Sequence, residues 1–168
     1  MRWEFIDKKF KENKKLYFLQ SALATFTIFL ILLFLDVVTH TAIIATLGAT
    51  AFVVFAMPHA YISKMRVLKG GYIIGMIVGG LCSYAANSHI IAINGNEEIA
   101  YIIFGGLAVG IAILLMVVTN TEHPPAAGMA LGLVLNKWDY KTIIFILLAL
   151  TTMVLVKRVL KPKLIDLI

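Results

Sequence analysis

Residues 16–35 carry the sequence LYFLQSALATFTIFLILLFL, an unbroken run of twenty residues without a charge. A helix needs about 20 predominantly apolar residues to cross a hydrocarbon core of roughly 30 Å. Membrane-spanning β-strands instead alternate apolar and polar residues over about ten positions, and this stretch does not alternate. Helices are then the remaining structure that pairs every backbone polar group inside lipid. The stretch therefore predicts a membrane-spanning α-helix.

The rest of the chain repeats this pattern. Hydrophobic residues make up 61% of the sequence and charged residues only 14%, whereas soluble domains are under half apolar and about a quarter charged. The uncharged runs are 16–35, 37–63, 70–96, 99–121, 123–136 and 142–156. The first four are long enough to span a bilayer, whereas the last two hold only 14 and 15 residues. We therefore expect an all-α, polytopic transmembrane helical bundle.

This bundle should form a single transmembrane domain over residues 16–157, between two basic flanks. The approximate spans are expected at 16–35, 41–58, 70–93, 99–119, 124–136 and 141–157. A basic N-terminal segment, 1–15, is expected either to rest on anionic lipid as an interfacial helix or to be solvated. Residues 158–168 are expected to form a basic cytoplasmic tail.

The lysines and arginines predict the orientation, because basic residues are retained on the cytoplasmic side of a membrane. If all six runs cross, both termini are cytoplasmic, thirteen of the fifteen basic residues lie inside, and only Lys137 and Lys141 lie outside. If 41–58 and 124–136 were both re-entrant, the split would fall to ten against five. We therefore expect six crossings of a cell (inner or plasma) membrane, and whether the two short segments cross fully stays open.

An internal repeat relates the two halves of the chain. Residues 48–54, GATAFVV, match residues 127–133, AGMALGL, at an offset of 79. Because three crossings is an odd number, the halves would enter the membrane in opposite directions. We expect a 3+3 inverted repeat with shortened or broken second and fifth helices. The alternative is that the match reflects only the small residues with which membrane helices pack closely. Such residues also recur at Gly75, Gly79, Gly80, Gly105, Gly106 and Gly110.

The most polar embedded segment is TNTEHPPAAG, residues 119–128. A proline pushes the residue before it out of the helical region, so His123 should be extended and a helix should begin at the prolines. Since proline has no N–H, the first free amides would follow Pro125, and helix N-termini attract anions. The repeat places a second such start in the first half, so we expect opposed helix N-termini near mid-membrane. The candidate substrate-binding residues are His123, Pro124, Pro125, Ala126, Ala127 and Gly128, with Thr46, Gly48, Ala49 and Thr50 opposite.

These motifs resemble those of the HPP family of integral membrane proteins, named for the stretch that stands here as His123-Pro124-Pro125. The Gly-Ala-Thr-Ala element at 48–51 and the Gly-Gly pair at 70–71 belong to the same resemblance. The resemblance implies a protein with four or more membrane spans. Relatives in plant plastids are associated with nitrite transport. Many bacterial relatives have no assigned function.

Two ionisable residues of this segment allow alternative roles. Glu122 costs roughly 2.5–3.5 kcal/mol if embedded, so it either takes part in proton coupling or, as we favour, caps the following helix at the interface. His123 either binds an anion and carries a proton, or simply ties its ring to a carbonyl. No two of the four histidines have i, i+4 spacing and Cys82 is the only cysteine. We therefore expect no metal site and no cofactor.

The leading functional prediction is a transporter or channel for a small inorganic anion such as nitrite. The alternative is a non-transporting membrane interaction or scaffold protein, in which the prolines only shape a kink. An enzyme is not expected, because the sequence holds no HExxH motif, nucleophile elbow or embedded acid cluster. The expected partners are the anion and the bilayer, with a homo-oligomer left open and no nucleic acid.

Overall fold

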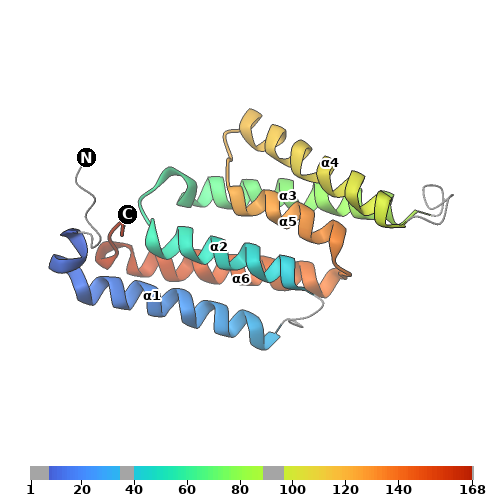
Figure 1. Cartoon of the computed structure of the whole chain (residues 1–168). Coiled ribbons are helices and arrows are strands. Elements are labelled where there is room, and N and C mark those ends of the chain that lie inside the picture. Colours follow the sequence, from blue (N-terminus) through green and yellow to red (C-terminus); the bar gives the residue numbers. More distant parts are fainter. Residues whose placement is uncertain (1–7, 35–39, 89–96, 168) are drawn as a thin grey trace.

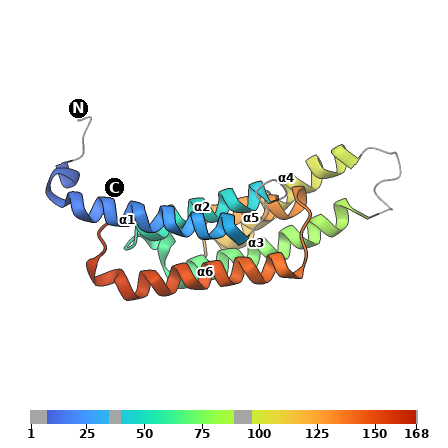
Figure 2. The same ribbon diagram turned by 90° about the horizontal axis from the view of Figure 1, so that it is seen from below.

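The polypeptide folds into a bundle of helices that run roughly along one direction (Figure 1, Figure 2). The computed structural model describes residues 8–34, 40–88 and 97–167, and the regular structure within these ranges is entirely helical. The α-helices are α1 (Lys8–Phe34), α2 (Thr41–Ala56), α3 (Met65–Ala86), α4 (Glu97–Val118), α5 (Pro124–Leu135) and α6 (Tyr140–Leu160). The 3-10 helices η1 (Tyr61–Ser63) and η3 (Lys161–Lys163) follow α2 and α6. The prediction of an all-α membrane bundle is confirmed.

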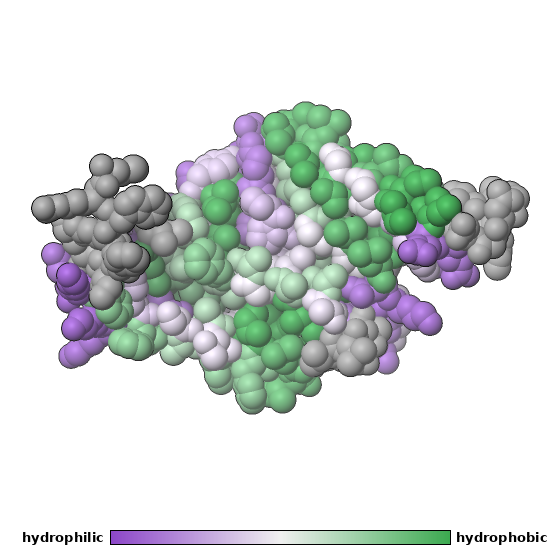
Figure 3. Space-filling view, in the orientation of Figure 1, coloured by the Kyte–Doolittle hydropathy of each residue, from purple (hydrophilic) through white to green (hydrophobic). Residues whose placement is uncertain are grey.

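Helix length separates four of these elements from the other two. Within the described residues, α1, α3, α4 and α6 are long and apolar enough to span a membrane. Helices α2 and α5 have 16 and 12 residues, or about 24 and 18 Å at 1.5 Å per residue. They are thus shorter than a hydrocarbon core of roughly 30 Å. Figure 3 shows the apolar surface over the middle of the bundle and polar residues at its ends.

Successive helices run in opposite directions along the bundle. Helix α5 is parallel to α3, because Gly71 lies against His123 and, further along both helices, Gly79 lies against Ala130. The α2–α3 and α4–α5 connections therefore lie toward the same end, where the hydroxyl of Tyr61 donates to the carbonyl of Asn120 at 2.9 Å. The basic residues after α2 and in the last turn of α6 share this end, which we call the basic end. This segregation agrees with the charge pattern on which the predicted orientation rests.

The helices form two groups that meet at α2 and α5. Helix α3 packs most extensively on α5 and then on α4, and α4 also packs on α5. In the other group, α2 packs on α1 and, less extensively, on α6. The third helix of each half therefore packs with helices of the other half, α3 with α4 and α5, and α6 with α2. The inverted repeat itself stays a prediction.

The observed helix bounds differ from the expected spans at the basic end. Helix α1 begins at Lys8, inside the expected segment 1–15, and is interrupted at Asn13, whose φ of −122° and ψ of 30° are not helical. Helix α3 begins at Met65 rather than at residue 70, because the basic turn before the apolar run is itself helical. Residues 1–7, and 89–93 of the expected third span, lie outside the described residues.

Residues near the C-terminus, within the segment 158–168 that was expected to form a basic cytoplasmic tail, pack against the bundle. Leu164 is buried, and the amide of Leu167 donates to the carbonyl of Ala56 at 2.8 Å. The buried side chain of Gln20 in α1 donates to the carbonyls of Phe55 and Ile165. Because Gln20 is a polar residue inside an apolar helix, these backbone groups supply the partners that lipid cannot.

Candidate functional site

The segment between α4 and α5 begins with a well-defined helix end. Asn120 has a φ of 51°, the left-handed conformation that terminates many helices. The amide of Thr121 donates to the carbonyl of Met116 at 2.9 Å, and that of Asn120 donates to Val117 at 3.2 Å. These two bonds form a Schellman motif. They turn the chain from α4 toward the centre of the bundle.

Helix α5 begins at Pro124, as the sequence predicted, and His123 precedes it with an extended backbone at φ −127° and ψ 95°. One part of the expectation is wrong. The amide of Ala126 donates to the carbonyl of His123 at 2.8 Å, so it is not free for an anion. The two prolines have no N–H to offer, and the first turn therefore presents few unpaired donors.

Glycines on α3 bring this segment close to the helix. An added Cβ at Gly70 would lie 3.0 Å from Cβ of Thr121, and one at Gly71 would lie 2.8 Å from Cβ of His123. Gly71 is six residues into α3, or about 9 Å along its axis. The start of α5 accordingly lies further along the bundle than the α2–α3 connection (Figure 1). Figure 3 shows a polar strip reaching into the apolar surface where α4 ends.

A polar cluster of Thr50, Tyr72 and His123 occupies the crossing of α2, α3 and α5, and all three side chains are fully buried. The hydroxyl of Thr50 lies 2.7 Å from the hydroxyl of Tyr72 and 3.1 Å from Nε2 of His123. Nδ1 of His123 lies 3.1 Å from the carbonyl of Ile62 in η1. The carbonyl of Thr46 lies 3.1 Å from the Thr50 hydroxyl and 3.3 Å from that of Tyr72.

These distances allow two hydrogen-bond arrangements. A carbonyl only accepts, so Nδ1 of His123 carries a proton and donates to Ile62, and in the neutral ring Nε2 accepts from Thr50. If Nε2 gains a proton it becomes a donor, and the Thr50 hydroxyl can turn to the Thr46 carbonyl. The cluster can therefore accommodate a proton on His123 without losing its partners.

The structure brings some of the predicted site residues together and separates others. Thr46 and Thr50 face α5, where an added Cβ at Gly128 would lie 2.8 Å from Cγ2 of Thr46. Gly48 instead faces Ile28 of α1, and Ala49 is exposed. The latter two residues therefore lie outside the cluster.

The expected pair of opposed helix N-termini is not present. Helix α2 is continuous from Thr41 to Ala56, so residues 46–50 lie in its middle rather than at a start. Its direction is opposite to that of α5, because Gly132 near the end of α5 lies against Ile43 near the start of α2. The N-terminus of α5 is thus close to the later turns of α2. A side-chain cluster stands where two helix ends were predicted.

Glu122 does not cap α5, which has no side-chain cap. Its Oε2 is buried and has no hydrogen-bond partner among the described residues. The capping role is therefore wrong, since both prolines lack an N–H and the next amide is bonded to His123. An embedded acidic group without a partner is costly and is usually functional. A role in proton coupling stays a prediction, as does an interfacial position of Glu122.

Tyr72 was not predicted as a site residue. It is fully buried, and its ring lies 5.5 Å from that of His123 between centroids. The available signal was its position directly after the glycine pair at 70–71, where small residues let a neighbour approach. Among the described residues, no group of three His, Cys, Asp or Glu side chains is placed to hold a metal ion.

Comparison with known proteins identifies the family. The family model described as HPP, transmembrane region, matches residues 11–162, which is nearly the whole chain. A transmembrane protein of Dictyostelium discoideum is 32% identical over 89 residues, which cover 53% of this chain and 28% of that protein. No solved structure matches the chain significantly. Because the family model also covers the His-Pro-Pro segment and the helices that enclose it, the chain belongs to the HPP family of integral membrane proteins.

Proposed function

We propose that this multi-pass membrane protein transports a small anion, nitrite or a similar monoanion, and that the cluster of Thr50, Tyr72 and His123 binds it. The observation that carries the proposal is the burial of these three polar side chains at the crossing of α2, α3 and α5. Polar groups inside a membrane are costly to retain, and they often mark substrate pathways. The nitrite transport associated with plant relatives of the family supports the same ligand class.

The chemistry of the cluster suits an anion that moves with a proton. A protonated His123 supplies an N–H at Nε2, and the hydroxyls of Thr50 and Tyr72 supply two more donors around the same point. The positive ring offsets the charge of the anion, so the pair costs less in the membrane than the anion alone. Glu122, whose Oε2 has no hydrogen-bond partner among the described residues, would exchange the proton with His123 next to it in the chain.

Access to the cluster requires α2 and α5 to separate. His123 has no exposed surface, and neither has Thr50, so an anion reaches them only when this crossing opens. Transporters commonly move one bundle of helices against another around a fixed site. The division into two helix groups that meet at α2 and α5 provides such a boundary.

The test is nitrite flux into liposomes that contain the purified full-length protein. Thr50→Val should lower the flux at least tenfold because it removes a donor to the anion. His123→Gln should lower it as much because glutamine cannot carry the proton and its positive charge. Thr27→Val is the matched control, since the Thr27 hydroxyl bonds to Leu23 of its own helix, away from the cluster. Absence of flux for any small monoanion, or equal flux in all four proteins, would overturn the proposal.

One observation favours the second candidate, a membrane scaffold in which the cluster is structural. Both ring nitrogens of His123 already have partners within the chain. In that case the wild-type protein would carry no anion, while Thr50→Val would still lower the thermal stability, because Nε2 would lose its partner. Measuring flux and thermal unfolding on the same samples separates the two functions.

A further inference from the structure

A pocket of about 340 Å³ lies at the basic end, between the start of α3, the residues around η1 and the last turns of α6. Four basic side chains line it, from Lys64, Lys157, Arg158 and Lys161. The pocket also includes His59 and Ser63. It is separate from the cluster around His123, none of whose side chains lines it.

Lys157 is the buried basic residue of this pocket, with only 9% of its surface exposed. Its ammonium donates to the backbone carbonyl of Ser63 and, at 2.7 Å, to the Ser63 hydroxyl. That hydroxyl donates in turn to the carbonyl of Pro58 at 2.9 Å. An ammonium has three N–H donors, and these contacts use two. Serine thus fixes the lysine in place without neutralising its charge.

Acidic side chains in the described part of the chain form no ion pairs with these four basic residues. Asp166 is the acid close by, and it is engaged with His59, accepting from the backbone amide at 2.9 Å and lying 3.6 Å from Nδ1. Within residues 8–34, 40–88 and 97–167, no carboxylate lies within ion-pairing distance of Lys157. A buried charge is costly unless it is paired. An anion bound in the pocket would supply the partner that the described residues lack.

We propose that this pocket binds a phosphate group, carried either by an anionic phospholipid headgroup or by free phosphate. Several cations around one cavity match the multiple oxygens and the charge of a phosphate better than those of a monoanion. Arg158 can bind two phosphate oxygens at once, and the lysines act as point charges. Basic pockets between membrane helices are general binding sites for such headgroups.

The experiment uses the full chain, purified in a neutral detergent and stripped of lipid. Two ligand arms are titrated at constant ionic strength while binding is followed by thermal stabilisation and native mass spectrometry. One arm is inorganic phosphate, and the other is short-chain phosphatidic acid, with phosphatidylcholine as the zwitterionic reference. Saturable binding in the lipid arm alone assigns a headgroup, and saturable binding in both arms assigns phosphate chemistry from either source.

The variants decide whether binding occurs at this pocket. Arg158→Gln and Lys161→Gln change exposed side chains that line it, and each should weaken binding at least tenfold. Lys157→Met should abolish binding, and the two exposed variants keep the test valid if this buried change prevents folding. Lys141→Gln, at the other end of the bundle, is the matched control and should bind as the wild type does. Lack of saturable binding in both arms, or equal affinity in Arg158→Gln, overturns the proposal.

Discussion

The two sides of the bundle are packed in different ways. On one side α3 and α5 are in backbone contact, because Gly71, Gly75 and Gly79 form one face of α3 at four-residue spacing. A Cβ added at Gly79 would lie 2.6 Å from the carbonyl oxygen of Ala130 and 2.8 Å from its Cα. Membrane helices associate through such close packing, because in lipid there is no hydrophobic driving force for their association. This side holds the start of α5, and with it His123, in a fixed position.

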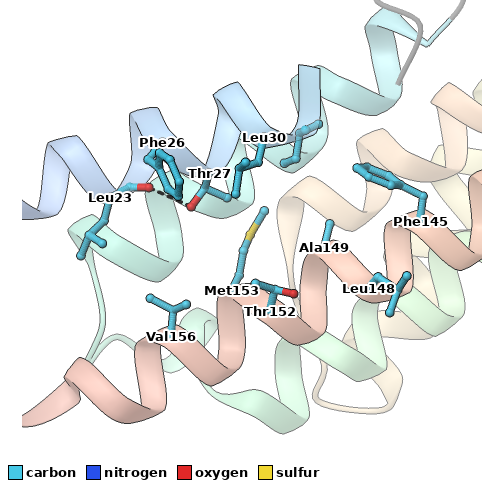
Figure 4. Close-up of a pocket in the computed structure, with 11 residues that line it drawn as sticks. Leu23, Phe26, Thr27, Leu30, Phe145, Leu148, Ala149, Thr152, Met153 and Val156 are labelled. Carbon is cyan, nitrogen blue, oxygen red and sulfur yellow. Dashed lines mark hydrogen bonds between the residues drawn. The ribbon is translucent and has the colours of Figure 1, made fainter. Parts of the chain in front are cut away.

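On the other side, α1 and α6 leave a cavity of about 450 Å³ between large apolar side chains (Figure 4). Leu23, Phe26 and Leu30 line it from α1, and Phe145 and Met153 line it from α6. Branched and aromatic side chains keep these helices apart, whereas glycines let α3 and α5 meet. In this membrane protein small residues, rather than hydrophobic ones, mark the tight interface.

The strongest test of this contrast is Gly79→Ala in α3. The new methyl group would collide with the backbone of α5, which cannot rotate away as a side chain can. We expect a loss of about 1–3 kcal/mol of unfolding free energy, the usual cost of overpacking. Reversible unfolding in mixed detergent micelles measures this loss.

Gly110→Ala in α4 is the matched control, because an added Cβ there meets no atom of the described residues within 4 Å. Alanine is also the better helix former, so this variant should unfold at the wild-type midpoint or slightly above it. Equal destabilisation by both changes would show that the cost comes from helix backbone effects. The distinction between the two sides would then fail.

The sequence predicted much of this packing, but not which glycines matter. The spacing of Gly75 and Gly79 indicated close helix crossings, and the structure confirms it for both. Gly106 and Gly110 have the same spacing, yet an added Cβ at either meets nothing within 4 Å in the part of the chain that the structure describes. Spacing identifies a face of small residues, whereas the presence of a neighbour on that face depends on the tertiary arrangement.

The candidate site was predicted only in part, because some of its contacts also depend on the tertiary arrangement. Local chemistry determines the extended His123 and the helix start at Pro124, and both expectations were correct. The partner Thr50 lies 73 residues away in the chain, and its contact with His123 depends on α2 running antiparallel to α5. The repeat match was taken to imply a helix start at 46–50, but residues equivalent in a repeat need not have equivalent helix ends.

A smaller effect is expected from Gln20→Leu, which tests the contacts that hold α1 on the side of the bundle with the cavity between α1 and α6. Gln20 bonds to the carbonyls of Phe55 and Ile165, and its Oε1 accepts from the amide of Ile165 at 3.3 Å. Leucine would remove these bonds, each worth about 1 kcal/mol net, but burial of its apolar side chain would recover part of that loss. The net cost should be about 1 kcal/mol. Leucine would also remove one of the contacts that hold the C-terminal segment, so carboxypeptidase should shorten the variant faster than the wild type. Thr27→Val, on the same helix, should leave the digestion rate unchanged, and equal rates in Gln20→Leu would show that other contacts hold this segment.

The smallest effect is expected where the cavity can accept a larger side chain. Ala149 of α6 lines the space between α1 and α6, so Ala149→Leu adds its extra atoms to an existing void. The unfolding free energy should change by no more than about 0.5 kcal/mol. Ala130→Leu is the opposite case, because Ala130 is fully buried against Gly79 of α3, and it should be far more destabilising. If Ala149→Leu were equally damaging, another molecule would have to fill the space between α1 and α6 in the folded protein. Both sides of the bundle would then be tightly packed, and they would differ only in whether this chain or another molecule makes the contacts.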